Sequence, residues 1–410
     1  MDRHSLSRED RRSITEPSRE LPISADGDVL VVGGGIAGIA ASLAAARCGR
    51  SVILIERAGA LGGLATLGLV NIYLPLCDGE GNQVIGGIAE ELLKASILYG
   101  PGDIPECWRG GSPPSTSARR ENRYRVTFNP ASLALAAEEL LLTSGVSILY
   151  DTRYCWPFRR SSAIEAVAIE SKSGRSAITC RYVIDASGDA DVCFTSGEET
   201  VSSGDNRDGS WFISFSDGQL SMERDYGETH YSQARPPGVR GYYGDSAEDV
   251  SDLLIQNHQS VLSVMRDRIL LDRNLNYPVV IPTLPQFRTT RRLRGRTELR
   301  EEDQRHRSAD TVGTFGDWRK PGVLFYLPLS ALTGVKNRNL AVAGRCISVS
   351  DPVSEMTRAI PVCALTGQVA GTLASHVVET GEPSDSVSPS FYDRLKESGV
   401  ILAPESVSEP

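Results

Sequence analysis

Residues 28–38 read Asp-Val-Leu-Val-Val-Gly-Gly-Gly-Ile-Ala-Gly, and this stretch decides the fold. Residues 29–32 are apolar and mostly β-branched, which predicts a short buried strand. A GxGxxG pattern fills residues 33–38, and the alanine-rich run at 39–46 predicts a helix. A second predicted strand, residues 51–56, ends in an acid. This order of elements is typical of a dinucleotide-binding βαβ unit.

Each member of the pattern has a mechanical role in binding a dinucleotide. Gly33 allows the tight turn, Gly35 lets the backbone approach a pyrophosphate, and Gly38 lets helix and strand pack closely. The helix N-terminus offers free N–H groups and the positive end of the helix dipole. Glu56 is expected to accept hydrogen bonds from the adenosine ribose. Because residue 56 is not basic, it cannot receive a 2′-phosphate, which disfavours NADP.

A glycine pair, Gly62 and Gly63, follows the acid by six residues. With this pair the chain resembles the glutathione-reductase-like superfamily of FAD proteins, and more narrowly the broad family of FAD-dependent oxidoreductases. FAD is therefore the cofactor that the resemblance implies. Four segments carry the resemblance, namely residues 28–66, 182–189, 287–295 and 339–371.

The resemblance also implies roles for later residues. The Ser-Gly-Asp turn at residues 187–189 is expected beside the cofactor, Arg345 beside its phosphates, and Arg358 at the pyrimidine edge of the flavin. A helix that opens at Pro361 is expected to point its N-terminus at that edge, where reduced flavin carries negative charge. The expected cofactor contacts are Gly33, Gly35, Ile36, Ala37, Gly38, Glu56, Arg57, Gly62, Gly63, Leu64, Ala65, Thr66, Ser187, Gly188, Asp189, Gly344, Arg345 and Arg358.

The implied fold class is α/β: a Rossmann-like FAD-binding domain of the glutathione-reductase type with an inserted α+β substrate domain. Alternating runs at residues 164–169 and 177–183 predict a small antiparallel excursion within it. The expected organisation is a disordered tail at 1–26, an FAD-binding domain at 27–199 with an insertion near 67–128, a substrate or cap domain at 200–334, the returning part of the FAD-binding domain at 335–380, and a frayed Ser/Pro-rich C-terminal tail at 381–410.

Composition limits the other possibilities. The 410 residues carry a formal charge of -9, which argues against a nucleic-acid partner. The eight cysteines show no metal-binding spacing, so we expect no metal site and reduced thiols in a cytoplasmic protein. Residues 1–25 lack the apolar segment of a signal peptide. The uncharged run at residues 29–46 is interrupted by three glycines, so we expect no membrane span.

The absence of two sequence motifs limits the class of redox reaction that we expect. No second dinucleotide fingerprint follows a strand, and residues 63–68 lack the CxxxxC motif of disulfide reductases. We therefore expect a dehydrogenase or oxidase that transfers a hydride between a small organic substrate and N5 of the flavin, with an unknown electron acceptor. A flavin-dependent monooxygenase using NAD(P)H and oxygen, or a non-catalytic FAD-binding subunit of a larger redox complex, stay open as alternatives.

An arginine-rich segment, residues 286–296, suggests a catalytic side chain. Its composition predicts a strand, so alternate residues should face opposite ways. The face expected to be solvated carries Arg288, Thr290, Arg292, Arg294 and Arg296. Arg291 would then point inward, where it must find a substrate carboxylate, an FAD group or an internal acid. Arg291 is therefore a candidate catalytic residue.

His230 is the candidate general base. It lies in a loop rich in Tyr, Pro and Gly at residues 226–244, a composition that suggests a lid or a cavity wall.

Overall fold

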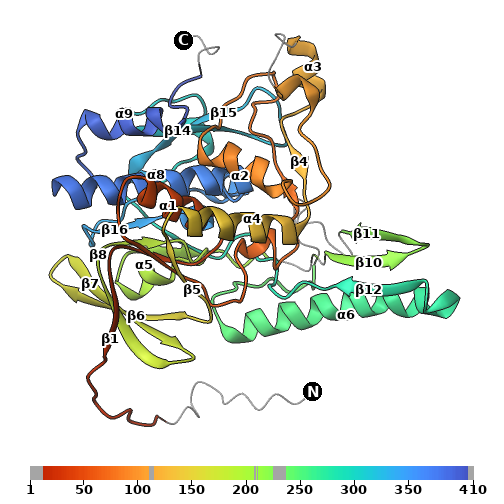
Figure 1. The fold of residues 1–410 in the computed structure, drawn as a ribbon, viewed down its shortest axis with the longest axis horizontal. Helices are drawn as coiled ribbons and strands as arrows, with labels where there is room; N and C mark the ends of the chain where they lie inside the picture. Colours follow the sequence, from red (N-terminus) through yellow and green to blue (C-terminus); the bar gives the residue numbers. More distant parts are fainter. Residues whose placement is uncertain (1–12, 110–114, 207–208, 210, 225–236, 405–410) are drawn as a thin grey trace.

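The computed structural model describes residues 13–109, 115–206, 209, 211–224 and 237–404 (Figure 1). At its centre lies a seven-stranded sheet whose parallel part has the strand order β5-β2-β1-β8-β16. Residues 29–31 are completely buried, as expected for a parallel strand covered on both faces. The parallel strands are β1 (Ile23–Val32), β2 (Val52–Ile55), β5 (Ser147–Leu149), β8 (Gly174–Asp185) and β16 (Leu340–Val342).

β8 has two different neighbours along one side. Its first half pairs antiparallel with β7 (Ala163–Ser171), and its last residues pair parallel with β16. β6 (Arg153–Arg160) extends the antiparallel part beyond β7. The antiparallel excursion predicted from the alternating runs is therefore confirmed, and it returns the chain to the middle of the sheet.

Four helices lie together on one face of the sheet (Figure 1): α1 (Ile36–Arg47), α2 (Ile88–Ser96), α4 (Pro130–Thr143) and α8 (Ile360–Thr380). α1 and α8 run parallel and touch through their backbones. A Cβ atom at Gly367 would lie 2.1 Å from the carbonyl oxygen of Ala37, and one at Gly371 would lie 2.2 Å from that of Ala41. Only glycine permits so close an approach. Because Gly367 lies against Ala37 and Gly371 against Ala41, the two helices run in the same direction.

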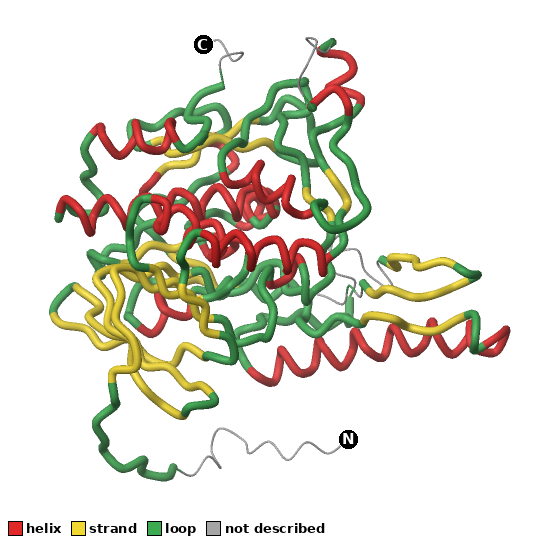
Figure 2. The backbone as a smooth tube through the Cα atoms, in the orientation of Figure 1, coloured by secondary structure: helices red, strands yellow, loops and turns green. Residues whose placement is uncertain are grey.

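Residues 211–287 include a part that projects from this body (Figure 2). There α6 (Ala247–Asp272) packs on a three-stranded antiparallel sheet of order β11-β10-β12, around a small core of Phe212, Val261 and Met265. By contrast, Phe315 and Phe325 belong to the main core. The small core of the projecting part therefore does not extend to residue 334, which is the expected end of the substrate domain. The strands of the small sheet are Phe212–Ser216 (β10), Gln219–Glu223 (β11) and Asn276–Val280 (β12).

The remaining elements are short and border the sheet or connect its parts. They are β3 (Ile72–Tyr73), α3 (Thr116–Glu121), β4 (Val126–Thr127), α5 (Asp191–Thr195), β9 (Thr200–Ser202), β13 (Arg291–Leu293), β14 (Thr311–Gly316), β15 (Leu324–Pro328) and α7 (Asp351–Thr357).

Among the helices in the described residues, none combines the length and apolarity needed to cross a membrane.

The prediction of a frayed C-terminal tail is wrong for residues 389–402. α9 (Pro389–Glu397) packs on α8, and the side chains of Phe391 and Leu395 are completely buried. The Ser/Pro composition that suggested disorder instead starts a helix, with Ser388 as N-cap and Pro389 in the first turn. At the other end, β1 begins at Ile23, inside the segment 1–26 expected to be a disordered tail.

Candidate functional site

A cavity of about 480 Å³ lies at the carboxyl ends of β1, β8 and β16. This is the edge at which open α/β sheets bind their ligands. Its wall combines segments that are far apart in the sequence, within residues 33–37, 56–74, 186–191, 244–251, 284–291 and 343–363.

The three glycines of the GxGxxG pattern meet different surroundings. Gly33 has a φ of +103°, and a Cβ atom there would lie 2.5 Å from the carbonyl oxygen of Ala186. A Cβ atom at Gly38 would lie 1.8 Å from the carbonyl oxygen of Gly33. Both glycines are therefore required by the fold. A Cβ atom at Gly35 would meet no protein atom within 4 Å, and Gly35 lines the cavity. The open space at Gly35 is therefore part of the cavity.

Two helix N-termini open into the same cavity. Gly35 caps α1 and Ala359 caps α8, and neither provides a side chain that bonds the first turn. Ile36 and Ile360, the first helical residues, both line the wall. Unpaired N–H groups and the positive ends of two helix dipoles therefore face one space, which favours a negatively charged ligand.

Glu56 follows the end of β2 and ties two loops of the wall together. Its Oε2 accepts a hydrogen bond from the backbone N–H of Gly34 at 2.7 Å, and its Oε1 accepts one from that of Ala58 at 2.8 Å. Glu56 also lines the cavity.

The glycine pair that follows lies against the first glycine loop. Gly62 has a φ of +99°, and its N–H donates to the carbonyl of Gly34 at 2.8 Å. Thr66 donates its hydroxyl to the carbonyl of Leu61 at 2.5 Å, which closes the turn. Residues 63–65 form a single 3₁₀ turn on the wall.

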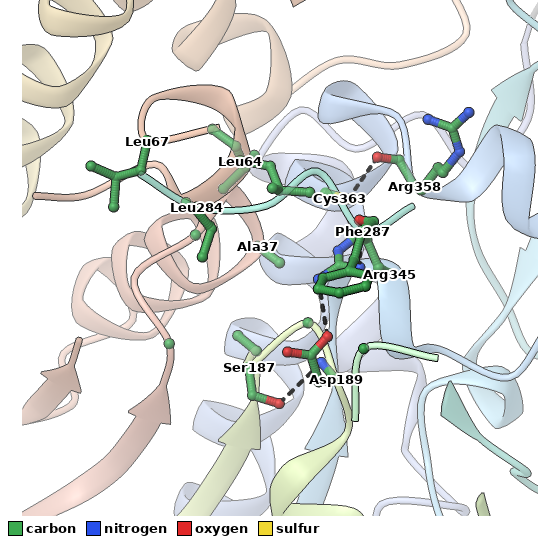
Figure 3. A pocket seen from close by; sticks show the side chains of 18 of the residues that line it. Ala37, Leu64, Leu67, Ser187, Asp189, Leu284, Phe287, Arg345, Arg358 and Cys363 are labelled. Carbon is green, nitrogen blue, oxygen red and sulfur yellow. Dashed lines mark hydrogen bonds and ion pairs between the residues drawn. The ribbon is translucent and has the colours of Figure 1, made fainter. Parts of the chain in front are cut away.

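The turn after β8 is fixed by acids. Fully buried Asp185 accepts hydrogen bonds from the N–H and the hydroxyl of Ser187, at 3.1 and 2.6 Å. Asp189 accepts a bond from the Nη2 of Arg345 at 3.1 Å, as Figure 3 shows, and one from the hydroxyl of Thr290 at 2.7 Å. Arg345 follows β16, so this ion pair joins the ends of two neighbouring strands at the cavity.

Arg291 and Asp191 form a second ion pair on the wall. The Nη2 of Arg291 donates to Asp191 at 2.7 Å, its Nε donates to the carbonyl of Asp189 at 3.0 Å, and its guanidinium lies 4.2 Å from the ring centre of Phe194. Desolvation, with Asp189 and Asp185 nearby, raises the pKa of Asp191 to about 6 despite Arg291. An internal acid therefore accepts one of the hydrogen bonds of Arg291. Such an acid was one of the three partners expected for this side chain, beside a substrate carboxylate and an FAD group.

Comparison with known proteins identifies the family. The family model described as FAD dependent oxidoreductase matches residues 28–236 and 256–398, which is most of the chain. The chain belongs to this family. It is therefore an FAD-dependent oxidoreductase, an enzyme whose cofactor is FAD. A search of curated proteins finds no match.

Solved structures resemble the chain only distantly. A geranylgeranyl bacteriochlorophyll reductase-like protein from Thermoplasma acidophilum has 12% identity over 91% of this chain and 83% of its own, with a TM-score of 0.42. CabE, an aromatic hydroxylase from angucycline biosynthesis, has 15% identity over 91% of this chain and 65% of its own, with a TM-score of 0.44. The myxobacterial chondrochloren halogenase CndH has 15% identity over 91% and 78%, with a TM-score of 0.42. None of these similarities informs the reaction of this oxidoreductase.

The residues present fit FAD. A phosphate-bearing ligand needs open space at Gly35 and N–H groups at the starts of α1 and α8, and the oxidoreductase has both. Burial raises the pKa of the Cys363 thiol on the wall to about 12, so this cysteine is not a thiolate nucleophile.

Most of the residues expected to contact the cofactor line this one cavity. All of them do so except Gly38 and Thr66, which lie behind it and hold the two glycine loops in shape. Arg358 lines the cavity and donates to Glu355 at 2.6 Å.

His230 lies outside the described residues, so its proposed role stays a prediction. The other histidines that the structure describes do not line the cavity. His258 bonds the carbonyl of Pro282 at 2.9 Å, His306 is exposed, and His376 is fully buried beside Glu382.

The prediction of a solvated arginine face is wrong in part. β13 spans only Arg291–Leu293, so strand alternation does not extend back to residue 287. Arg288, Thr290 and Arg292 are buried, whereas Arg294 and Arg296 are exposed, as expected.

Sequence reasoning missed part of the wall. The stretch from Gly244 to Ser251, at the start of α6, contributes to it, as do the apolar side chains of Leu67, Leu284 and Phe287 (Figure 3). Arg153 and Arg288 add positive charge. The Gly/Pro/Tyr composition of residues 226–244 hinted at a cavity wall, but these apolar residues carry no motif.

Proposed function

We propose that this FAD-dependent oxidoreductase is a dehydrogenase or oxidase that takes a hydride from a small organic substrate. When bound, FAD supplies the hydride acceptor, N5 of its isoalloxazine ring. The observation that carries the proposal is the continuity of one cavity. It extends from the glycine loop at Gly35 to an apolar wall at Leu67, Leu284 and Phe287, so cofactor and substrate share one space.

The finer fold assignment belongs to the same proposal. The strand order β5-β2-β1-β8-β16, with an antiparallel excursion through β6 and β7, supports a glutathione-reductase type of FAD-binding domain. α6 and its small sheet would be the inserted substrate domain, because α6 starts at the cavity.

Different residues of the site would bind different parts of FAD and shield the reacting substrate. The N-terminus of α1, with Gly35, would hold the pyrophosphate, and Glu56 would receive the adenosine ribose. The N-terminus of α8 would stabilise negative charge on the reduced ring. Leu67, Leu284 and Phe287 would exclude water from the reacting carbon.

Arg291 stays our candidate catalytic residue. Its Nε and Nη2 are held by Asp189 and Asp191, whereas its Nη1 makes no hydrogen bond with any residue that the structure describes. A guanidinium fixed on one side would present the other to the substrate.

Anaerobic titration of the purified yellow protein tests the function. Bleaching of the flavin by a small organic substrate alone supports a dehydrogenase or oxidase. Bleaching by NAD(P)H only supports a monooxygenase, and inertness to both supports a non-catalytic subunit; either outcome would sink the proposal.

A further inference from the structure

The projecting part of the molecule exposes a large apolar surface. We call residues 212–223 and 247–281, which hold α6 and its small sheet, the arm. Eleven of the 22 large apolar side chains that are exposed in the described residues lie on it. Together they expose on the order of 1,000 Å², more than the about 300–600 Å² of the largest apolar patch on a typical monomer. A stable interface takes about 800 Å² from each partner, so the arm has enough apolar surface for one. The eleven are Leu220, Ile255, Leu262, Ile269, Leu270, Leu271, Leu275, Tyr277, Val279, Val280 and Ile281.

α6 carries two apolar stripes, of which only one is buried. The buried residues recur every four positions along the helix and pack on the rest of the chain. The second stripe consists of Ile255, Leu262 and Ile269, which are 55, 51 and 43% exposed. Because seven residues make nearly two turns of helix, these three side chains lie in a row on one side of α6. α6 lies at the outer edge of the projecting part (Figure 1).

The end of β12 borders this exposed stripe. His258 follows Ile255 by three positions and precedes Leu262 by four, so it lies between them on the helix surface. Its Nε2 is hydrogen bonded to the carbonyl of Pro282 at 2.9 Å. Residues 279–281 are exposed and apolar and directly precede this contact. They therefore enlarge the apolar surface beside the stripe.

The spacing of the stripe is symmetric about its centre. Leu262 has Ile255 seven positions before it and Ile269 seven positions after it. In an antiparallel pair of α6 helices with a two-fold axis beside Leu262, Leu262 meets Leu262 of the partner subunit. Ile255 then meets Ile269 of the partner subunit. A two-fold interface uses the same surface on both copies, so this spacing favours a second copy of the chain as the partner.

The charge of α6 disfavours a lipid surface as the partner. Amphipathic helices that bind membranes are rich in Lys and Arg on their polar face. α6 contains five acids, two arginines and no lysine. Anionic lipid would therefore repel this helix, whereas a second copy contacts it through neutral side chains.

We propose that two copies of this chain form a dimer in which their α6 helices pack antiparallel through Ile255, Leu262 and Ile269. Removal of these side chains from water drives the association, and residues 279–281 lie at the rim. None of the three stripe residues lines the cofactor cavity. The inference therefore goes beyond the proposed function and does not depend on it.

Sedimentation velocity of the FAD-loaded protein tests the dimer. We expect the wild type to sediment as a dimer at micromolar concentration. Leu262→Glu should be monomeric with normal FAD content, because two introduced glutamates would meet at the axis. Leu142→Glu, at a 58% exposed leucine of α4, is the control and should stay dimeric. A monomeric wild type, or a Leu262→Glu variant that is still a dimer, would overturn the proposal. So would a monomeric wild type that binds vesicles of phosphatidylcholine and phosphatidylserine, since the stripe would then face lipid.

A pair of charge substitutions tests the antiparallel register. Ile255→Glu and Ile269→Lys should each weaken dimerisation roughly tenfold or more, because each buries a charge without a partner. In the double variant each introduced glutamate faces an introduced lysine of the other copy, so dimerisation should recover. If the double variant binds FAD but dimerises no better than either single variant, the antiparallel pairing is wrong. Neither experiment uses a substrate, so their outcome is separate from that of flavin bleaching.

Discussion

Gly367 in α8 packs directly against the backbone carbonyl of Ala37 in α1, with room for no side chain between them. The two residues are 330 positions apart in the sequence, yet they lie where α1 and α8 pack side by side (Figure 1). Because both N-termini line the cavity, this contact holds together the part of its wall that carries the positive ends of two helix dipoles.

Replacing Gly367 by alanine should separate the two helices. The added Cβ atom would lie 2.1 Å from backbone, which cannot move like a flexible side chain, so we expect a loss of about 1–3 kcal/mol in the free energy of unfolding. FAD affinity should fall as well. Gly59→Ala, where a Cβ atom meets nothing within 4 Å, is the control for chemical denaturation and flavin content. Equal stability of both variants would show that the contact is unimportant.

Replacing Arg291 by methionine should separate cofactor binding from turnover. The variant loses the ion pair to Asp191 and the free Nη1, so we expect normal FAD content and turnover reduced below detection. Arg294→Met, whose ion pair with Glu199 is exposed, should keep both. Steady-state assay with an identified substrate provides the check, and undiminished turnover in Arg291→Met would remove this residue from the mechanism.

Asp191 should make the stability of the apoprotein depend on pH. Its folded-state pKa is raised to about 6 from 3.8, so the folded state takes up the proton first as the pH falls. The free energy of unfolding should therefore decrease as the pH rises from about 4 to about 6, and stay level above that. Subtracting the denaturation curves of Asp191→Asn from those of the wild type isolates this contribution. If the free energy of unfolding of the wild type instead increased relative to that of Asp191→Asn as the pH rises over this range, the folded-state pKa of Asp191 would be lowered and not raised.

The C-terminal helix should contribute strongly to stability. Phe391 is completely buried between α9 and α8, and truncation of such a side chain costs about 3–5 kcal/mol. We expect Phe391→Ala to lower the midpoint of thermal unfolding markedly, whereas Asp393→Ala on the exposed side of α9 should not. A mild effect of Phe391→Ala would mean that α9 is only loosely attached.

The cofactor half of the site could be predicted because its chemistry is local. Gly38 is dictated by the carbonyl oxygen of Gly33, five residues earlier, and Gly33 by its positive φ in the turn after the strand. Gly35 borders open space, and Glu56 follows the end of the next strand. A βαβ unit keeps these positions at fixed spacing, so the pattern is legible in the sequence.

The substrate half could not be predicted, because its residues meet only through tertiary packing. Alternation placed Arg288 on a solvated face, but the strand it assumed covers only residues 291–293. Nothing local to Arg288 indicates that Gln286 turns it toward the cavity or that Trp211 lies beside it. The helix α9 was missed for a similar reason, since burial of Phe391 against α8 outweighs a composition typical of loops.

Flavin content of the Gly35→Val variant, measured beside the wild type, tests the central claim most directly. A Cβ atom added at Gly35 meets no protein atom within 4 Å, and a valine side chain there would enter the space assigned to the pyrophosphate. We predict that the wild type holds FAD and that Gly35→Val binds little or none, while the two apoproteins unfold at the same temperature. A wild type that cannot be loaded with FAD, or a Gly35→Val variant that binds FAD as well as the wild type, would contradict the account.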